Sequence, residues 1–229
     1  MGVDSRGPDA SLRPVVVVVA ATVLVGAATS LLVGWGAKPA VNTFVEINAP
    51  AQSLMSVLLP LSGIMLVRRL APEGGRGVRW TLARAAGCAI IVAAVGVAAS
   101  AGVAAAVPAA TGRWGHAPTA VLGSLLVQLV AQSVGTALGL LVRRTAVAFL
   151  ATVVLPLGLW FLLGVVPAAT PAQAWVTPYA AATRLLSGEV GPVGWLEWLV
   201  MAALWTVALN VIALRAASSS SGHRPGDVR

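Results

Sequence analysis

The sequence predicts an all-α polytopic membrane protein, a bundle of six transmembrane helices joined by mostly short connectors. Hydrophobic residues make up 58% of the 229-residue chain and charged residues only 10%, whereas a soluble domain carries about 25% charge. Six stretches without any charged residue or histidine recur along the chain, most of them near the roughly 20 apolar residues that cross the hydrocarbon of a bilayer. Basic residues gather on alternate connectors, which indicates one consistent orientation.

The six stretches are residues 15–35, 49–67, 85–107, 118–142, 145–166 and 199–214. The last is short unless it includes residues 194–198, which brings Glu197 to the membrane edge. They divide the chain into a flexible cytoplasmic N-terminus over residues 1–13, a transmembrane domain over residues 14–214, and a tail over residues 215–229. The tail contains four consecutive serines and is expected to be disordered and cytoplasmic.

The basic residues predict the orientation in the membrane. With the N-terminus inside, 12 of the 15 basic residues lie on the inner side, and only Lys38, Arg113 and Arg184 lie outside. This asymmetry follows the positive-inside rule and places both termini in the cytoplasm of a multi-pass plasma-membrane protein. The net charge of +8 then needs no nucleic acid to explain it. The many arginines and the abundance of Ala and Val favour a bacterial source.

The first span carries signals for its start and for its packing. Ser11 is a predicted N-cap, and Pro14 suits a first helical turn. Gly26, Ser30 and Gly34 recur every four residues. Small residues at this spacing predict close approach to a neighbouring helix.

The connector between the second and third spans, residues 68–84, is the most charged part of the chain. Residues 72–75, with the sequence PEGG, predict a turn. Residues 78–84 are expected to form a short helix that leads into the third span. Two interpretations of the arginines stay open: they anchor this helix to anionic headgroups, or they dock a cytoplasmic partner.

The fourth span has a regular polar pattern. Ser124, Gln128, Gln132 and Thr136 follow one another at intervals of four, so they form a stripe along one side of a helix. This stripe is expected to face other helices or a wet cavity rather than lipid. It either joins helices by hydrogen bonds or lines a substrate pathway.

Two prolines and two arginines shape the later spans. Pro60 and Pro156 lie inside the second and fifth spans and predict bends there. Arg143 and Arg144 end the fourth span directly before the fifth begins. The fourth and fifth spans are therefore expected to form a tight hairpin.

The outer segment over residues 167–195 is too long for a minimal connector. Thr170 precedes a proline, as does Thr177, and both are predicted N-caps of short helices. Gly188 is a plausible stop for the second of them. The sequence thus predicts two short helices on the outer face before the last span.

The residues that catalysis requires are sparse. Cys88 is the only cysteine, and the two histidines, His116 and His223, fall in a loop and in the tail. No glycine-rich phosphate loop occurs, and none of the six stretches contains a His, Asp, Glu or Lys. We therefore expect no enzyme, no cofactor and no metal site, and a source of energy outside this chain.

Taken together, three segments resemble the membrane subunits of type-2 ATP-binding cassette (ABC) exporters. They are VRRLAPEGGRGVRWTLARAA between the second and third spans, the hairpin LLVRRTAVAFLATVVLPLGLWFLLG, and the outer segment AWVTPYAAATRLLSGE. The resemblance covers most of residues 49–214. It implies a permease that works as a homo- or heterodimer in membrane lipid, with ATP hydrolysed by a separate cytoplasmic subunit.

The resemblance also assigns roles to residues. The connector would carry a coupling helix that docks the ATP-binding subunit, through Arg68, Arg69, Glu73, Arg76, Arg79 and Arg84. Residues 175–187 would form the outer helices. One departure is the N-terminus, because residues 1–13 are too short and too rich in Gly and Pro for the family's amphipathic connecting helix.

The expected function is export of a hydrophobic or amphipathic compound. The alternative is a membrane protein that transports nothing, such as an assembly factor, a sensor or an immunity-type component. A membrane-embedded enzyme is a third hypothesis, disfavoured by the missing catalytic residues.

Overall fold

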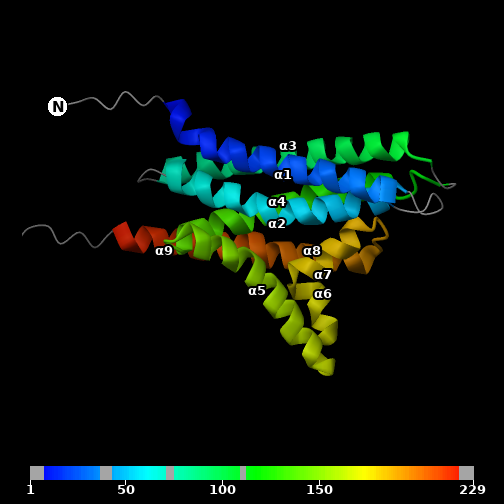
Figure 1. The fold of residues 1–229 in the computed structure, drawn as a ribbon. Coiled ribbons are helices and arrows are strands. Elements are labelled where there is room, and N and C mark those ends of the chain that lie inside the picture. The colour runs from blue at the N-terminus through cyan, green and yellow to red at the C-terminus, as the bar shows by residue number, and fades with distance from the viewer. Residues whose placement is uncertain (1–7, 37–42, 71–74, 109–111, 222–229) are drawn as a thin grey trace, which may run out of the picture.

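The computed structural model describes residues 8–36, 43–70, 75–108 and 112–221, and most of these residues are helical (Figure 1). The longer helices are α1 (Pro8–Gly36), α2 (Phe44–Leu70), α3 (Gly75–Ala106), α4 (Ala117–Leu141) and α5 (Thr145–Val165). The outer helices are the 3₁₀ helix η2 (Pro167–Ala172), α6 (Gln173–Val176) and α7 (Pro178–Leu186). The last span comprises α8 (Pro192–Ala202), the π-helix η3 (Ala203–Ala208) and α9 (Leu209–Ser221).

The predicted fold class is confirmed. Among the described residues, six helices are long and apolar enough to cross a membrane, and the sixth runs continuously from Pro192 to Ala216 through α8, η3 and α9. The chain is therefore a multi-pass integral membrane protein.

Several predicted boundaries need correction. Helix α1 begins at Pro8, so residues 8–13 of the predicted lead-in are helical, and Ser11 lies inside the helix rather than capping it. Residues 78–84 are not a separate short helix, because α3 runs without a break from Gly75 into the span. Helix α9 continues to Ser221, so the first residues of the predicted disordered tail are helical too.

Helices α2 and α4 form the centre of the bundle and share its most extensive contact. Glycines bring the two backbones together. A Cβ atom on Gly139 would lie 2.9 Å from the Ile64 Cα atom, and one on Gly135 would lie 2.7 Å from the Pro60 Cα atom. Real side chains do not approach a backbone this closely, so the crossing depends on glycine at these positions.

Helix α1 packs against α2 and α3 through its predicted row of small residues. Gly26 lies directly against the Met55 side chain, and Gly34 lies against Val103. Between them, the hydroxyls of Ser30 and Ser100 are hydrogen-bonded at 3.0 Å. The packing role predicted for this row is confirmed.

Helix α5 slants away from the bundle axis, and η2, α6 and α7 lead the chain back to it (Figure 1). Thr177 caps α7 as predicted, since its hydroxyl accepts a hydrogen bond from the Ala180 amide. Gly188 follows α7 with a φ of +75°, a left-handed conformation that suits glycine at a helix end. Thr170 does not start a helix, because it lies inside η2.

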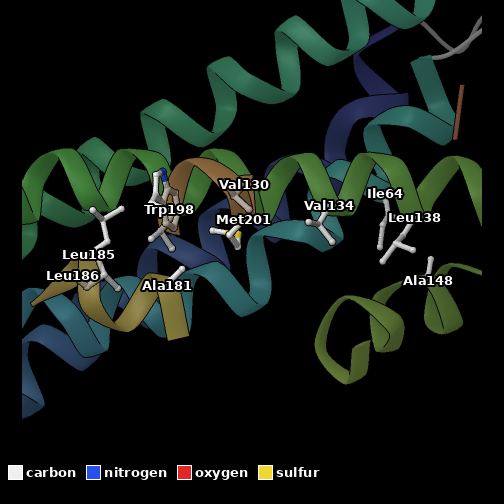
Figure 2. Packing of buried hydrophobic residues seen from close by; sticks show 11 residues of the cluster. Ile64, Val130, Val134, Leu138, Ala148, Ala181, Leu185, Leu186, Trp198 and Met201 are labelled. Atoms are coloured by element: carbon white, nitrogen blue, oxygen red, sulfur yellow. The ribbon is translucent and has the colours of Figure 1, made fainter. Parts of the chain in front are cut away.

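The largest apolar cluster joins α4 to the later helices. Figure 2 shows Val130, Trp198 and Met201 among the residues that link α4 with α8. Leu185 and Leu186 of α7 belong to the same cluster and are almost fully buried. This cluster attaches the outer helices and the last span to the bundle.

Candidate functional site

The polar stripe of α4 faces α2 and is buried. Ser124 accepts a hydrogen bond from the Asn48 amide at 2.9 Å. The Gln128 amide donates to both the backbone and the side-chain oxygen of Gln52, each at 2.9 Å. We call these interhelical bonds, together with the Gln132 pair described next, the polar seam.

The second half of the stripe consists of Gln132 and Thr136, which also contact other helices. The Gln132 amide donates to the Ser62 hydroxyl at 3.1 Å. The single proton of that hydroxyl is shared between the Leu59 carbonyl at 2.8 Å and the Gln132 side-chain oxygen at 3.2 Å. Thr136 donates to the Ser133 carbonyl within its own helix and makes only a 3.5 Å contact with Asn210 of α9. All four stripe residues are at most 1% exposed, so their contacts are with other helices.

Buried amides in lipid need partners, and most of the seam is satisfied. The exceptions among the described residues are the side-chain oxygens of Asn48 and Gln128, which have no hydrogen-bond partner. Interhelical hydrogen bonds in membranes contribute about 0.6 kcal/mol each. The seam therefore fixes the register of α2 against α4 more than it provides raw stability.

The α2 side of the seam was not predicted from the sequence. Asn48, Gln52 and Ser62 lie on the second span, and the spacing of four between the first two was visible in the sequence. Asn210 was also missed. Its signal is an amide in a span otherwise free of amide side chains.

A cavity of about 270 Å³ lies where α5 diverges from α2 and α4. We call it the α5 cavity. Its walls come from α2, α4, α5, α7 and α8, and none of the described side chains that line it is charged. Most of the lining is apolar, and its polar residues are Ser53, Ser56, Thr152, Tyr179 and Thr183.

Four of the hydroxyls that line the α5 cavity already donate their protons to backbone carbonyls. Ser53 and Ser56 donate their protons to carbonyls of α2. Thr152 and Thr183 likewise donate to carbonyls within their own helices. Since these protons are already used, the four oxygens present lone pairs, and the cavity offers mainly hydrogen-bond acceptors.

The ends of α2 and α9 and the starts of α1, α3 and α5 lie at one end of the bundle (Figure 1), and most of the arginines belong to these helix ends. We call this end of the bundle the arginine end, and its described side chains are Arg13, Arg68, Arg69, Arg84, Arg143, Arg144 and Arg215. The three carboxylates with described side chains, Glu46, Glu189 and Glu197, lie at the opposite end. There Glu197 is buried and paired with Arg184 of α7.

The predicted docking residues are only partly placed. Arg68 donates to the Thr145 hydroxyl at 2.6 Å and to the Val142 carbonyl, so it ties the end of α2 to the α4–α5 turn. Arg84 stacks on the exposed Trp80 ring at 5.1 Å. Arg69 is exposed at the end of α2. Glu73 and the side chains of Arg76 and Arg79 lie outside the described residues.

Among the described residues, no group of three or more His, Cys, Asp or Glu residues is placed to hold a metal ion. Comparison with protein-family models, curated proteins and solved structures finds no match for this chain.

Proposed function

We propose that this integral membrane protein is the permease subunit of a bacterial ABC exporter of the type-2 class. In this proposal it moves a hydrophobic or amphipathic compound across the plasma membrane, and a separate cytoplasmic subunit hydrolyses the ATP. The observation that carries the proposal is the α5 cavity, an uncharged hollow among the spans with hydroxyl oxygens in its wall.

The lining of the cavity favours a particular kind of cargo. An uncharged, largely apolar wall binds an apolar body, and oriented lone pairs accept hydrogen bonds from N–H or O–H groups. Two of the acceptors are the hydroxyl oxygens of Ser53 and Thr152. We therefore propose a neutral cargo that carries at least one hydrogen-bond donor.

The walls of the cavity differ in how firmly they are held. Helices α2 and α4 are joined by glycine contacts and by the polar seam. Helix α5 is mostly exposed, and only Ala148 and Thr152 on it are buried. A motion of α5 relative to α2 and α4 changes the shape of the cavity, which an alternating-access cycle requires.

The arginine end supplies a route from a cytoplasmic motor to α5. Arg68 bonds the end of α2 to Thr145, the first residue of α5. A partner that pushes on this end therefore acts on the α4–α5 turn directly. In the proposal the partner is the ATP-binding subunit, and a second permease chain completes the transporter.

The test is ATPase activity that purifies with the chain. The tagged protein would be isolated from its native membrane in a mild detergent, and ATP hydrolysis measured with and without a hydrophobic amide. We expect hydrolysis that the amide stimulates. Val57→Trp, which fills the α5 cavity from α2, should remove the stimulation and keep the basal rate.

The matched control is Val16→Trp, at an exposed position on α1 away from the cavity, which should change neither rate. If no ATPase purifies with the chain, the exporter proposal is wrong and the non-transporting alternative gains support. If hydrolysis is present but insensitive to Val57→Trp, the α5 cavity is not the cargo site.

A further inference from the structure

A second hollow lies on the other side of the α4–α8 contact. It has a volume of about 640 Å³, and its walls are α3 on one side and α8, η3 and α9 on the other, with α4 as the floor. We call it the α9 groove. Val130 and Trp198, shown in Figure 2, border both this groove and the α5 cavity.

The wall opposite α3 contains the π-helix η3. Its wider turn is closed by a hydrogen bond from the Leu209 amide to the Leu204 carbonyl, five residues earlier. Short π-helical segments are rare and occur frequently at functional sites. Here the segment places Thr206 on the groove.

The Thr206 hydroxyl differs from most threonine hydroxyls in the bundle. Those of Thr22, Thr29 and Thr183 donate to the carbonyl four residues earlier. Thr206 Oγ1 is shielded from solvent and has no hydrogen-bond partner among the described residues. A threonine in a helix has two accessible χ1 rotamers, so this hydroxyl can turn toward the groove.

Two neighbours of Thr206 keep hydrogen-bonding capacity as well. The Asn210 amide donates to Ser133 Oγ at 2.8 Å and to the Thr206 carbonyl at 2.8 Å. Among the described residues, Asn210 Oδ1 accepts only the 3.5 Å contact from Thr136. Ser133 Oγ accepts from Asn210 and donates to no described acceptor. The groove thus has a polar spot in an apolar wall.

We propose that the α9 groove binds an uncharged amphipathic molecule drawn from the bilayer, with its hydroxyl or carbonyl group on Thr206, Ser133 and Asn210. Within the part of the chain that the structure describes, no charged side chain lines the groove, which argues against an ionised ligand. The volume is that of a site for a drug-sized molecule.

The depth of the polar spot excludes a phospholipid headgroup as the polar partner. Ser133 lies about two helical turns, roughly 12 Å, from the end of α4 at Leu141. Headgroups lie outside the hydrocarbon, so a polar group at this depth belongs to a molecule that is immersed in it. This inference goes beyond the proposed function, because binding is a property of this chain without any ATPase.

The experiment uses two photoreactive probes on the full chain in phosphatidylcholine vesicles. One is a long-chain alcohol with a diazirine near its hydroxyl, and the other is the hydrocarbon with the diazirine at the same carbon. We expect the alcohol to label peptides from residues 126–136 and 199–210 about two- to tenfold more than the hydrocarbon does, the range that one hydrogen bond supplies.

Variants separate the groove from general lipid contact. The pair Thr206→Val and Ser133→Ala should reduce alcohol labelling of these peptides to the hydrocarbon level. Ala203→Leu, which narrows the groove from η3, should reduce labelling by both probes. Thr29→Val makes the same change on α1, a helix that does not line the groove, and should leave labelling unchanged.

Three results would overturn the proposal. They are equal labelling by the two probes, labelling spread over every lipid-facing helix, and alcohol labelling that survives the Thr206 and Ser133 changes in folded protein. Size-exclusion elution of each variant shows whether it is folded. Because no ATP is present, these results are independent of those that test the exporter.

Discussion

Helices α4 and α5 are adjacent in sequence, yet their environments are opposite. In an apolar stretch of 18 residues within each helix, 61% of the α4 residues are buried, against 11% of those in α5. The buried helix is the less hydrophobic of the two, with a mean hydropathy of 1.6 against 2.4. In lipid the interior of a bundle is where small and polar residues collect, because lipid is as apolar as any side chain. Between these two helices, the higher hydropathy therefore belongs to the one that faces outward.

The largest expected effect tests the glycine crossing of α2 and α4. Gly135→Leu places a side chain against the Pro60 backbone, which cannot move away without separating the helices. We expect a loss of about 3 kcal/mol or more. Thermal unfolding can be followed by a thiol-reactive dye on Cys88, the only cysteine, which is partly buried.

The matched control is Gly158→Leu on α5, where a Cβ atom meets nothing within 4 Å. It should change stability by about 0.5 kcal/mol or less. If both variants lose stability equally, the contrast between the two helices is wrong.

The next effect concerns the polar seam. Gln128→Leu removes two bonds to Gln52 and is expected to cost about 1 kcal/mol. Gln52→Leu combined with it should cost less than the sum of the two single changes. A double-mutant cycle on unfolding in detergent measures this coupling. Strict additivity would mean that the two amides do not interact.

A smaller effect is expected at the start of α5. Arg68→Ala removes the bonds to Thr145 and Val142, at about 0.5–1 kcal/mol for an exposed site. Amide hydrogen exchange should rise in the α4–α5 turn. Arg143→Ala, at an exposed residue of the same turn, is the control. An equal rise in exchange for both would refute the role of Arg68 as a tie.

The smallest effect on stability is expected from two cysteine substitutions that determine which end of the bundle faces the cytoplasm. Arg144→Cys and Val193→Cys, made in a Cys88→Ser background, place thiols at exposed positions on opposite ends. An impermeant thiol reagent added to intact cells should label position 193 alone. Labelling of position 144 instead would reverse the predicted orientation and remove the proposed docking face.

The sequence was sufficient for the spans and for the two ends of α7, but the N-caps predicted at Ser11 and Thr170 were wrong. The length of an uncharged run sets each span, and Thr177 with Gly188 sets the limits of α7. Contacts between spans were not predictable to the same degree. No local sequence pattern shows that Gln128 contacts Gln52, or that Gly135 contacts Pro60. These contacts depend on which helices are neighbours in the bundle. The π-helix was not predictable for the same reason. It lies beside Asn210, whose hydrogen bond to Ser133 of α4 is a contact between two spans.

The direct contact between the α2 and α4 backbones limits how the molecule can change shape. Helices that pack through layers of side chains can shift when those side chains change rotamer. Where the backbones of α2 and α4 are in direct contact, no side chains lie between them to rearrange. Helices α2 and α4 are thus expected to move as one rigid body. In the proposed transport cycle we therefore expect α5 and the last span to turn about that fixed pair, so spectroscopic distance labels on α2 and α4 should report no change while labels on α5 do.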